Sequence, residues 1–120
     1  MVNLKLSELP KLWIIDLDGT IIYHNSHKKL PQRLTKDAKN FLDRIPIQDQ
    51  IIFITAREKI YADITENFLK ANQIRFNIII YDIPHGERIL INDSKPSGLK
   101  TAYAINVIRD IGLSQYLDLF

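Results

Sequence analysis

Two carboxylic acids separated by one residue form the segment of this sequence with the most definite chemical meaning. Asp16 and Asp18 directly follow the apolar run Leu12–Ile15, and Gly19 lets the backbone turn after them. As the chain turns, both carboxylates can reach one cavity. One of them could attack a phosphorus atom, while the other could protonate the leaving oxygen and later take a proton from water. The same residues could also simply cap a turn, so their meaning depends on what surrounds them.

A magnesium ion would suit phosphoryl chemistry at such a pair. It would screen the repulsion between an attacking carboxylate and a phosphate and stabilise the charge on the phosphate oxygens. Magnesium prefers one or two protein carboxylates, several waters and the substrate phosphate as ligands. Asp16 and Asp93, which end two different apolar runs, could supply those carboxylates. We therefore expect Mg²⁺ as the cofactor.

A candidate phosphate cradle follows the next apolar run of the chain. Thr55 and Ala56 come directly after Ile51–Ile54 and open a predicted helix. A hydroxyl and free backbone N–H groups at a helix start can bind a phosphate, although a plain Thr N-cap uses the same residue type. Arg57 is either a substrate contact or a solvated side chain.

Short apolar runs and helical periodicities predict the elements that position these residues. Runs rich in β-branched residues, typical of strands buried on both faces of a parallel sheet, occur at 12–15, 51–54, 76–81 and 89–91. Helical spacing predicts helices at 34–45, with Thr35 as N-cap, at 57–71 and at 98–111, with Gly112 ending the last. The alternation predicts an α/β fold, a three-layer α/β/α sandwich with a Rossmann-like, mostly parallel sheet. In such sheets ligands bind beyond the carboxyl ends of the strands, where Asp16, Thr55 and Asp93 would converge.

Composition restricts the class of protein. The 120 residues fit a single domain spanning 1–120, and a net charge of +2 with scattered Lys and Arg argues against a nucleic-acid partner. The chain has no cysteine, no signal-peptide pattern because Lys5, Glu8 and Lys11 interrupt the N-terminus, and no apolar run that could span a bilayer. We therefore expect a cytoplasmic protein that is not embedded in a membrane.

Taken in order, these motifs resemble the haloacid dehalogenase (HAD) superfamily of phosphohydrolases. The resemblance rests on Asp16-x-Asp18-Gly19-Thr20, on Thr55 after the second run, and on Asp93 after the fourth. It implies that Asp16 is the nucleophile and a metal ligand, and that Asp18 is the acid/base and binds the metal through its carbonyl. It further implies that Thr55 binds the phosphoryl group and that Asp93 completes the metal site.

The sequence departs from the superfamily pattern at two points. The fourth motif carries a single clear acid, Asp93, within Asn92–Lys95. No residue matches cleanly the cation that neutralises the aspartyl-phosphate; Lys95 is the first choice and Arg88 the second. The run from Leu90 to Gly98 is similar to short HAD-like proteins of capsule and surface-polysaccharide biosynthesis.

The segment from Ile21 to Pro31, where HAD proteins place a cap, is too short for a cap domain. His24 and its polar neighbours could line the entrance and contact an anionic substrate. An open site would admit a large substrate or be closed by a neighbouring subunit in a homo-oligomer. We expect a phosphomonoester hydrolase that acts on a sugar phosphate or another small phosphorylated metabolite.

Two rival interpretations remain open at this stage. A response-regulator receiver domain is also a small α/β unit with an acidic magnesium site, and Asp82 could be its phosphorylated residue. A binding module that kept the fold but lost turnover would explain the single acid of the fourth motif.

Overall fold

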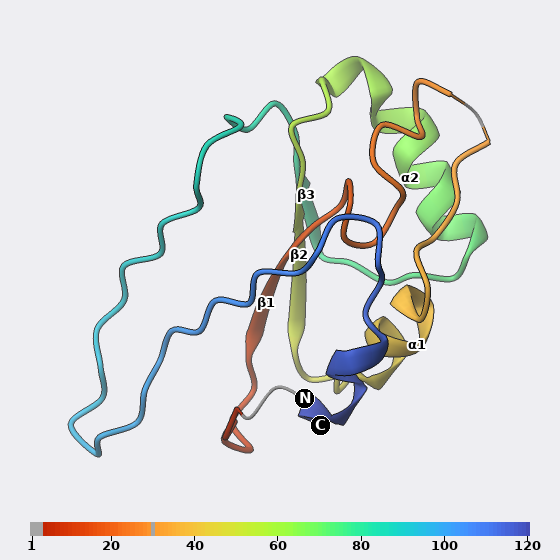
Figure 1. Ribbon diagram of the computed structural model, residues 1–120. Coiled ribbons are helices and arrows are strands. Elements are labelled where there is room, and N and C mark those ends of the chain that lie inside the picture. The colour runs from red at the N-terminus through yellow and green to blue at the C-terminus, as the bar shows by residue number, and fades with distance from the viewer. Residues whose placement is uncertain (1–3, 30) are drawn as a thin grey trace.

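A three-stranded parallel sheet forms the centre of the computed structural model, which describes residues 4–29 and 31–120 (Figure 1). Its strands are β1 (Leu12–Asp16), β2 (Gln50–Ile54) and β3 (Ile78–Ile80), in the order β1-β2-β3. Both neighbouring pairs are parallel. The sequence prediction of a small Rossmann-like α/β fold is thus confirmed.

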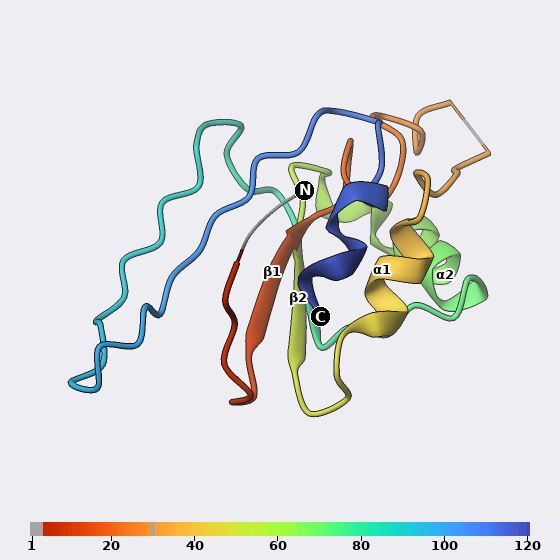
Figure 2. The same cartoon turned by 60° about the horizontal axis from the view of Figure 1, so that its bottom comes forward.

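The helices gather on one face of this sheet (Figures 1 and 2). They are α1 (Ala38–Arg44), α2 (Ala62–Ala71) and the 3-10 turns η1 (Lys59–Tyr61) and η2 (Ser114–Leu119). In the described part of the chain, no helix is long and apolar enough to cross a membrane.

The hydrophobic core lies between the sheet and these helices. Ile51 and Phe53 of β2 and Leu69 of α2 are fully buried there. Trp13 of β1 packs edge-on against Phe41 at 6.0 Å between ring centroids. The two strand-to-strand connections thus bury one face of each strand, whereas the continuous apolar runs predict burial on both faces; Leu12, Ile14, Ile78 and Ile80 stay about half exposed.

The helix starts differ from the sequence prediction because their polar residues bond elsewhere. Thr35 does not cap α1; its hydroxyl donates to the Thr20 carbonyl at 2.6 Å and helps tie down the loop after β1. The helix predicted from residue 57 becomes regular only at Ala62, after the turn η1. Ile60, within the range of that predicted helix, is 84% exposed as a result.

The prediction is wrong for the last third of the chain. Residues 89–91 form no strand and residues 98–111 form no helix. Residues 83–108, called the arm below, instead run out and back as two irregular limbs on the side of the sheet opposite the helices (Figures 1 and 2). A helix rich in β-branched residues needs a surface to pack on, and the arm stands away from the sheet. The second helical layer of the expected sandwich is therefore not formed.

Both ends of the arm are fixed to the loops at the carboxyl ends of the strands. The Ile83 N–H donates to the Thr55 carbonyl at 3.2 Å, and the Asp110 N–H donates to the Gly19 carbonyl at 2.8 Å. The arm therefore begins and ends beside the predicted site, although its tip lies far from it (Figure 1).

Candidate functional site

The first acid of the predicted pair ends β1, and the second lies in the tight turn that follows. The Leu17 carbonyl accepts hydrogen bonds from the N–H groups of Thr20 and Ile21, at 3.2 and 2.9 Å. Gly19 adopts a φ of +87°, which favours glycine, so the chain reverses within a few residues. This turn brings the Asp18 carboxylate to the end of β2.

Asp18 is held by two residues that follow β2. The Thr55 hydroxyl donates to Asp18 Oδ2 at 2.9 Å. The Arg57 guanidinium donates through Nη2 to Oδ1 at 2.9 Å and through Nε to both oxygens at 3.1 Å. Thr55 is fully buried and Arg57 is 3% exposed. The structure thus brings together three residues predicted from the sequence, but Arg57 contacts Asp18 instead of facing solvent.

A second pair of side chains, which sequence reasoning missed, fixes Arg57 in turn. Its Nη1 donates to Gln32 Oε1 at 2.7 Å and to Thr65 Oγ1 at 2.8 Å. Thr65 itself donates to the Tyr61 carbonyl at 2.7 Å, and Gln32 donates to the Ile64 carbonyl at 3.1 Å. Each polar group is satisfied, which is what allows a guanidinium to be buried here. No spacing in the sequence links these residues, because they meet only through the fold.

Asp16 has a different environment from Asp18. In the described part of the chain its carboxylate accepts one side-chain hydrogen bond, from the Thr20 hydroxyl at 3.3 Å. Burial, and then the negative charge of Asp18, raise the pKa of Asp16 from 3.8 to about 6. An under-solvated carboxylate with a free oxygen is suited to attack an electrophile or to bind a cation.

His27 lies on the other side of Asp18, in the segment expected to line the entrance. It is 6% exposed, and its Nδ1 is 3.9 Å from Asp18 Oδ1. Its ring packs edge-on against Tyr61 at 4.6 Å. Burial and the nearby Arg57 charge lower the pKa of His27, so the neutral imidazole is favoured. His27 is a wall of the site and not part of a solvated loop.

The remaining predicted contacts lie at the rim. Ala56 is half-buried between Thr55 and Arg57, whereas His24 and Arg88 are exposed. The positive charges of Arg88 and His24 both lower the pKa of Asp16, by less than burial and Asp18 raise it. The His24 N–H donates to Asp110 Oδ1 at 2.9 Å, which ties the rim to the end of the arm.

Two predicted residues are not brought to the acids. Asp93 and Lys95 are exposed at the tip of the arm, where the Lys95 carbonyl accepts the Gly98 N–H at 2.9 Å. Asp82, the alternative phosphorylation site, lies exposed after β3 and accepts the Lys59 N–H at 3.1 Å. The cluster around Asp18 thus contains neither Asp93 nor Lys95, which were predicted to extend the site, nor Asp82 of the alternative interpretation.

Within residues 4–29 and 31–120, no group of three or more acidic or histidine side chains could hold a metal by itself. The Asp16 carboxylate nevertheless fits magnesium, which takes most of its ligands from water and phosphate. The pKa of Asp16 is raised by burial and then by the negative charge of Asp18, and a bound cation would offset both effects. The Asp18 carbonyl accepts no backbone hydrogen bond from the described residues and is a further oxygen donor.

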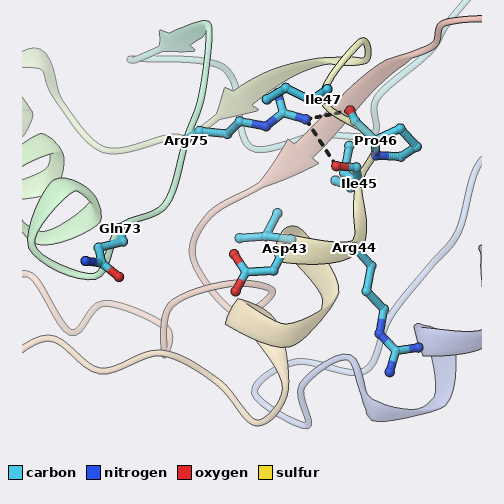
Figure 3. Close-up of a pocket in the computed structure, with 8 residues that line it drawn as sticks. Asp43, Arg44, Ile45, Pro46, Ile47, Gln73 and Arg75 are labelled. Atoms are coloured by element: carbon cyan, nitrogen blue, oxygen red, sulfur yellow. Dashed lines mark hydrogen bonds between the residues drawn. The ribbon is translucent and has the colours of Figure 1, made fainter.

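A separate pocket of about 410 Å³ lies at the other end of the strands from the acid cluster, beside the residues that precede β2 (Figure 3). Arg75 crosses it and donates to the carbonyls of Ile45 and Pro46, at 3.3 and 2.7 Å. These bonds satisfy the carbonyls beyond the end of α1. The guanidinium is occupied by backbone groups, so this pocket does not compete with the acid cluster as the site of chemistry.

Comparison with known proteins gives neighbours in structure alone. No protein-family model matches the chain, and no curated protein matches it. Two solved structures resemble it with a TM-score of 0.53, at 26% and 24% sequence identity. They are structures of the Pnkp1/Rnl/Hen1 complex, one of them described as an RNA repair complex. The matches cover 69% and 73% of this chain but 31% and 30% of the neighbours' chains, so the shared unit is about a third of each neighbour.

Proposed function

We propose that this protein hydrolyses phosphomonoesters through a covalent intermediate on Asp16, as its resemblance to the HAD phosphohydrolases implies. The observation that carries the proposal is the contrast within the acid pair. Asp18 is fixed by Arg57 and Thr55, whereas Asp16 keeps a free oxygen and a raised pKa at the end of β1. A site of this kind separates an attacking group from a positioned proton carrier.

The proposed reaction has two steps. In the first, Asp18 enters carrying a proton; an Asp16 oxygen forms a bond to phosphorus while the bond to the leaving oxygen breaks, and the Asp18 proton passes to that leaving oxygen. In the second, Asp18 takes a proton from water as the water oxygen attacks phosphorus and releases Asp16. Arg57 and Thr55 keep the Asp18 carboxylate oriented for both transfers, and the buried wall around His27 limits competing water.

Magnesium is part of the proposal, and Asp16 with the carbonyl of Asp18 would hold it. The ion would neutralise phosphate charge and lower the repulsion felt by the attacking carboxylate. Asp93 remains a proposed third ligand, which requires the arm to take a position different from the one described. Lys95 and Arg88 remain the alternatives for the phosphate-neutralising cation; the charge of Arg88 acts on Asp16 in the present structure.

The test is phosphate release from a generic aryl phosphate with and without Mg²⁺. We expect Mg²⁺-dependent turnover that Asp16→Asn abolishes. Asp118→Asn, which removes an exposed carboxylate on η2, is the matched control and should retain activity. Trapping and mapping the phosphorylated residue separates this proposal from a receiver domain, since label on Asp82 in place of Asp16 would contradict it. No turnover on a broad phosphomonoester panel would favour the binding module.

The substrate class has two candidates. A sugar phosphate or another small metabolite suits an uncapped site whose rim carries His24 and Arg88. A terminal phosphate of RNA is the second candidate, favoured by structural neighbours that belong to an RNA repair complex. A panel that contains sugar phosphates and RNA oligonucleotides with 3′ or 5′ phosphates decides between them by comparing kcat/KM.

A further inference from the structure

One face of the sheet carries no covering layer within the described chain. Leu12 and Ile14 of β1 are 52% and 48% exposed, and Ile78 and Ile80 of β3 are 52% and 45% exposed. The parallel register places Ile52 and Ile54 of β2 between them on the same face. Six aliphatic side chains on three adjacent strands form a continuous apolar surface, here called the open face. Exposed apolar patches of this kind mark interaction sites.

The arm carries the same type of surface and leaves it equally exposed. Ile89 and Ile91 are 84% and 90% exposed, and Ile108 on the return limb is 67% exposed. The limbs project on the side of the molecule to which the open face is turned (Figures 1 and 2). One molecule therefore presents an apolar sheet and an apolar arm on the same side, and neither covers the other.

The amount of exposed surface fits a missing partner of substantial size. A folded monomer of 14.0 kDa exposes about 6,700 Å² by the usual scaling with mass. This chain exposes 8196 Å², and its longest dimension is 47 Å against 27 and 26 Å for the others. The excess of about 1,500 Å² exceeds the roughly 800 Å² that each partner contributes to a standard stable interface.

We propose that two copies of this chain form a two-fold dimer by exchanging arms, so that the arm of each copy covers the open face of the other. A two-fold interface uses the same surfaces on both subunits, and each copy here supplies both the donor and the acceptor surface. The exchange forms a closed dimer and not an open chain of molecules, because each copy has one arm and one open face. It needs no partner of another sequence.

The exchange would also act on the acid cluster. Side chains alternate along a strand, so Asp16 lies on the same side of β1 as Leu12 and Ile14. An arm laid over the open face thus abuts Asp16 and excludes water from it. The exchanged copy provides the closure that the short segment after β1 is unable to give.

The absence of cysteine from the sequence allows a direct test. Chains carrying Ile14→Cys and chains carrying Ile91→Cys, with one of the two fused to a mass tag, are mixed and oxidised. We expect a disulfide between a tagged and an untagged chain, and a mass near twice 14.0 kDa for the unmodified protein by light scattering. An arm that folds back onto its own sheet would instead give a monomeric mass, and an intrachain disulfide in a chain that carries both Ile14→Cys and Ile91→Cys.

Charge substitution provides a second, independent test of the dimer. Ile14→Lys is expected to weaken the dimer by about 30-fold or more, because it buries an unpaired charge at the interface centre. Ile47→Lys is the matched control, since Ile47 is 82% exposed at the opposite end of the sheet and should leave the mass unchanged. Unfolding curves show that each variant is folded. A monomer at all concentrations, or a dimer unaffected by Ile14→Lys, overturns the proposal; neither readout depends on phosphatase activity.

Discussion

The strand β2 and the arm contain similar aliphatic runs that differ in burial. In Ile51-Ile52-Phe53-Ile54, the first and third side chains are fully buried beneath α1 and α2. In Ile89-Leu90-Ile91, all three are more than half exposed. The two runs have the same local preference for extended backbone, so local preference does not decide between them. The difference is the covering layer, which β2 receives from its own chain and the arm does not.

The comparison extends to charged residues. Arg57 is buried among hydrogen-bond acceptors that three different segments provide. Arg88, at the base of the arm, donates to the carbonyls of Pro84 and Gly86 a few residues away. The body is held by contacts between distant residues and the arm by local ones. Matched substitutions in the two regions should therefore differ in how much they lower the free energy of unfolding.

Ile51→Ala and Ile91→Ala make the same chemical change in the two regions. Ile51→Ala removes buried methyl groups from the core and should lower the free energy of unfolding by about 3–4 kcal/mol. Ile91→Ala should lower it by less than about 0.5 kcal/mol. Urea unfolding of both variants in the monomeric Ile14→Lys background provides the measurement. Equal costs would mean that the arm is packed in solution.

Arg57→Met and Arg88→Met test the charged side chains. Arg57→Met leaves the Asp18 carboxylate largely buried with only Thr55 to support it, which should cost about 3 kcal/mol. Arg88→Met should be within about 0.5 kcal/mol of the parent protein. A double-mutant cycle with Asp18→Asn should recover part of the Arg57→Met loss, since it removes the unpaired charge. No recovery would indicate that Arg57 contributes through packing alone.

Gly112→Ala and Gly98→Ala compare two glycines with positive φ, +93° and +88°. At Gly112 an added Cβ would collide with the backbone of Lys36, where the chain returns to α1. Nothing lies near an added Cβ at Gly98, in the arm. We expect losses of about 2–3 kcal/mol and about 1 kcal/mol, respectively, in urea unfolding of the monomeric Ile14→Lys background. A larger loss at Gly98 would place the arm tip against another surface.

The sequence indicates correctly the residues whose positions follow from local pattern. Asp16 and Asp18 lie at the end of β1, and Thr55 lies at the end of β2, because short apolar runs followed by polar residues define strand ends. The contacts of Arg57 with Gln32 and Thr65 were not predictable in this way. They join a loop, a strand end and a helix that are brought together only by packing.

The arm marks the second limit of the sequence prediction. The run 89–91 and the periodicity of 98–111 satisfy the patterns for a strand and a helix, yet neither element forms. Both patterns describe surfaces that require an apolar partner, and a pattern contains no information on where the partner is. Gly112, predicted as a helix end, is needed for a different reason, its close approach to Lys36.

Asp16→Asn and Asp93→Asn form the last matched pair, for which we expect the smallest difference in the free energy of unfolding. Because burial and Asp18 raise the pKa of Asp16 to about 6, the folded state binds a proton more tightly than the unfolded state does. The contribution of Asp16 to the free energy of unfolding is therefore fully present below pH 3.8 and is lost as the pH rises through about 6. At pH 7 and without Mg²⁺, Asp16→Asn should thus raise the free energy of unfolding by about 1–2 kcal/mol, after allowance for solvent screening, and at pH 4 the gain should shrink towards zero. Asp93→Asn, exposed on the arm, should change stability at neither pH. A gain in the free energy of unfolding at pH 7 that persists at pH 4 would contradict this explanation. It would mean that the gain does not come from removing the charge that Asp16 carries, buried and beside Asp18.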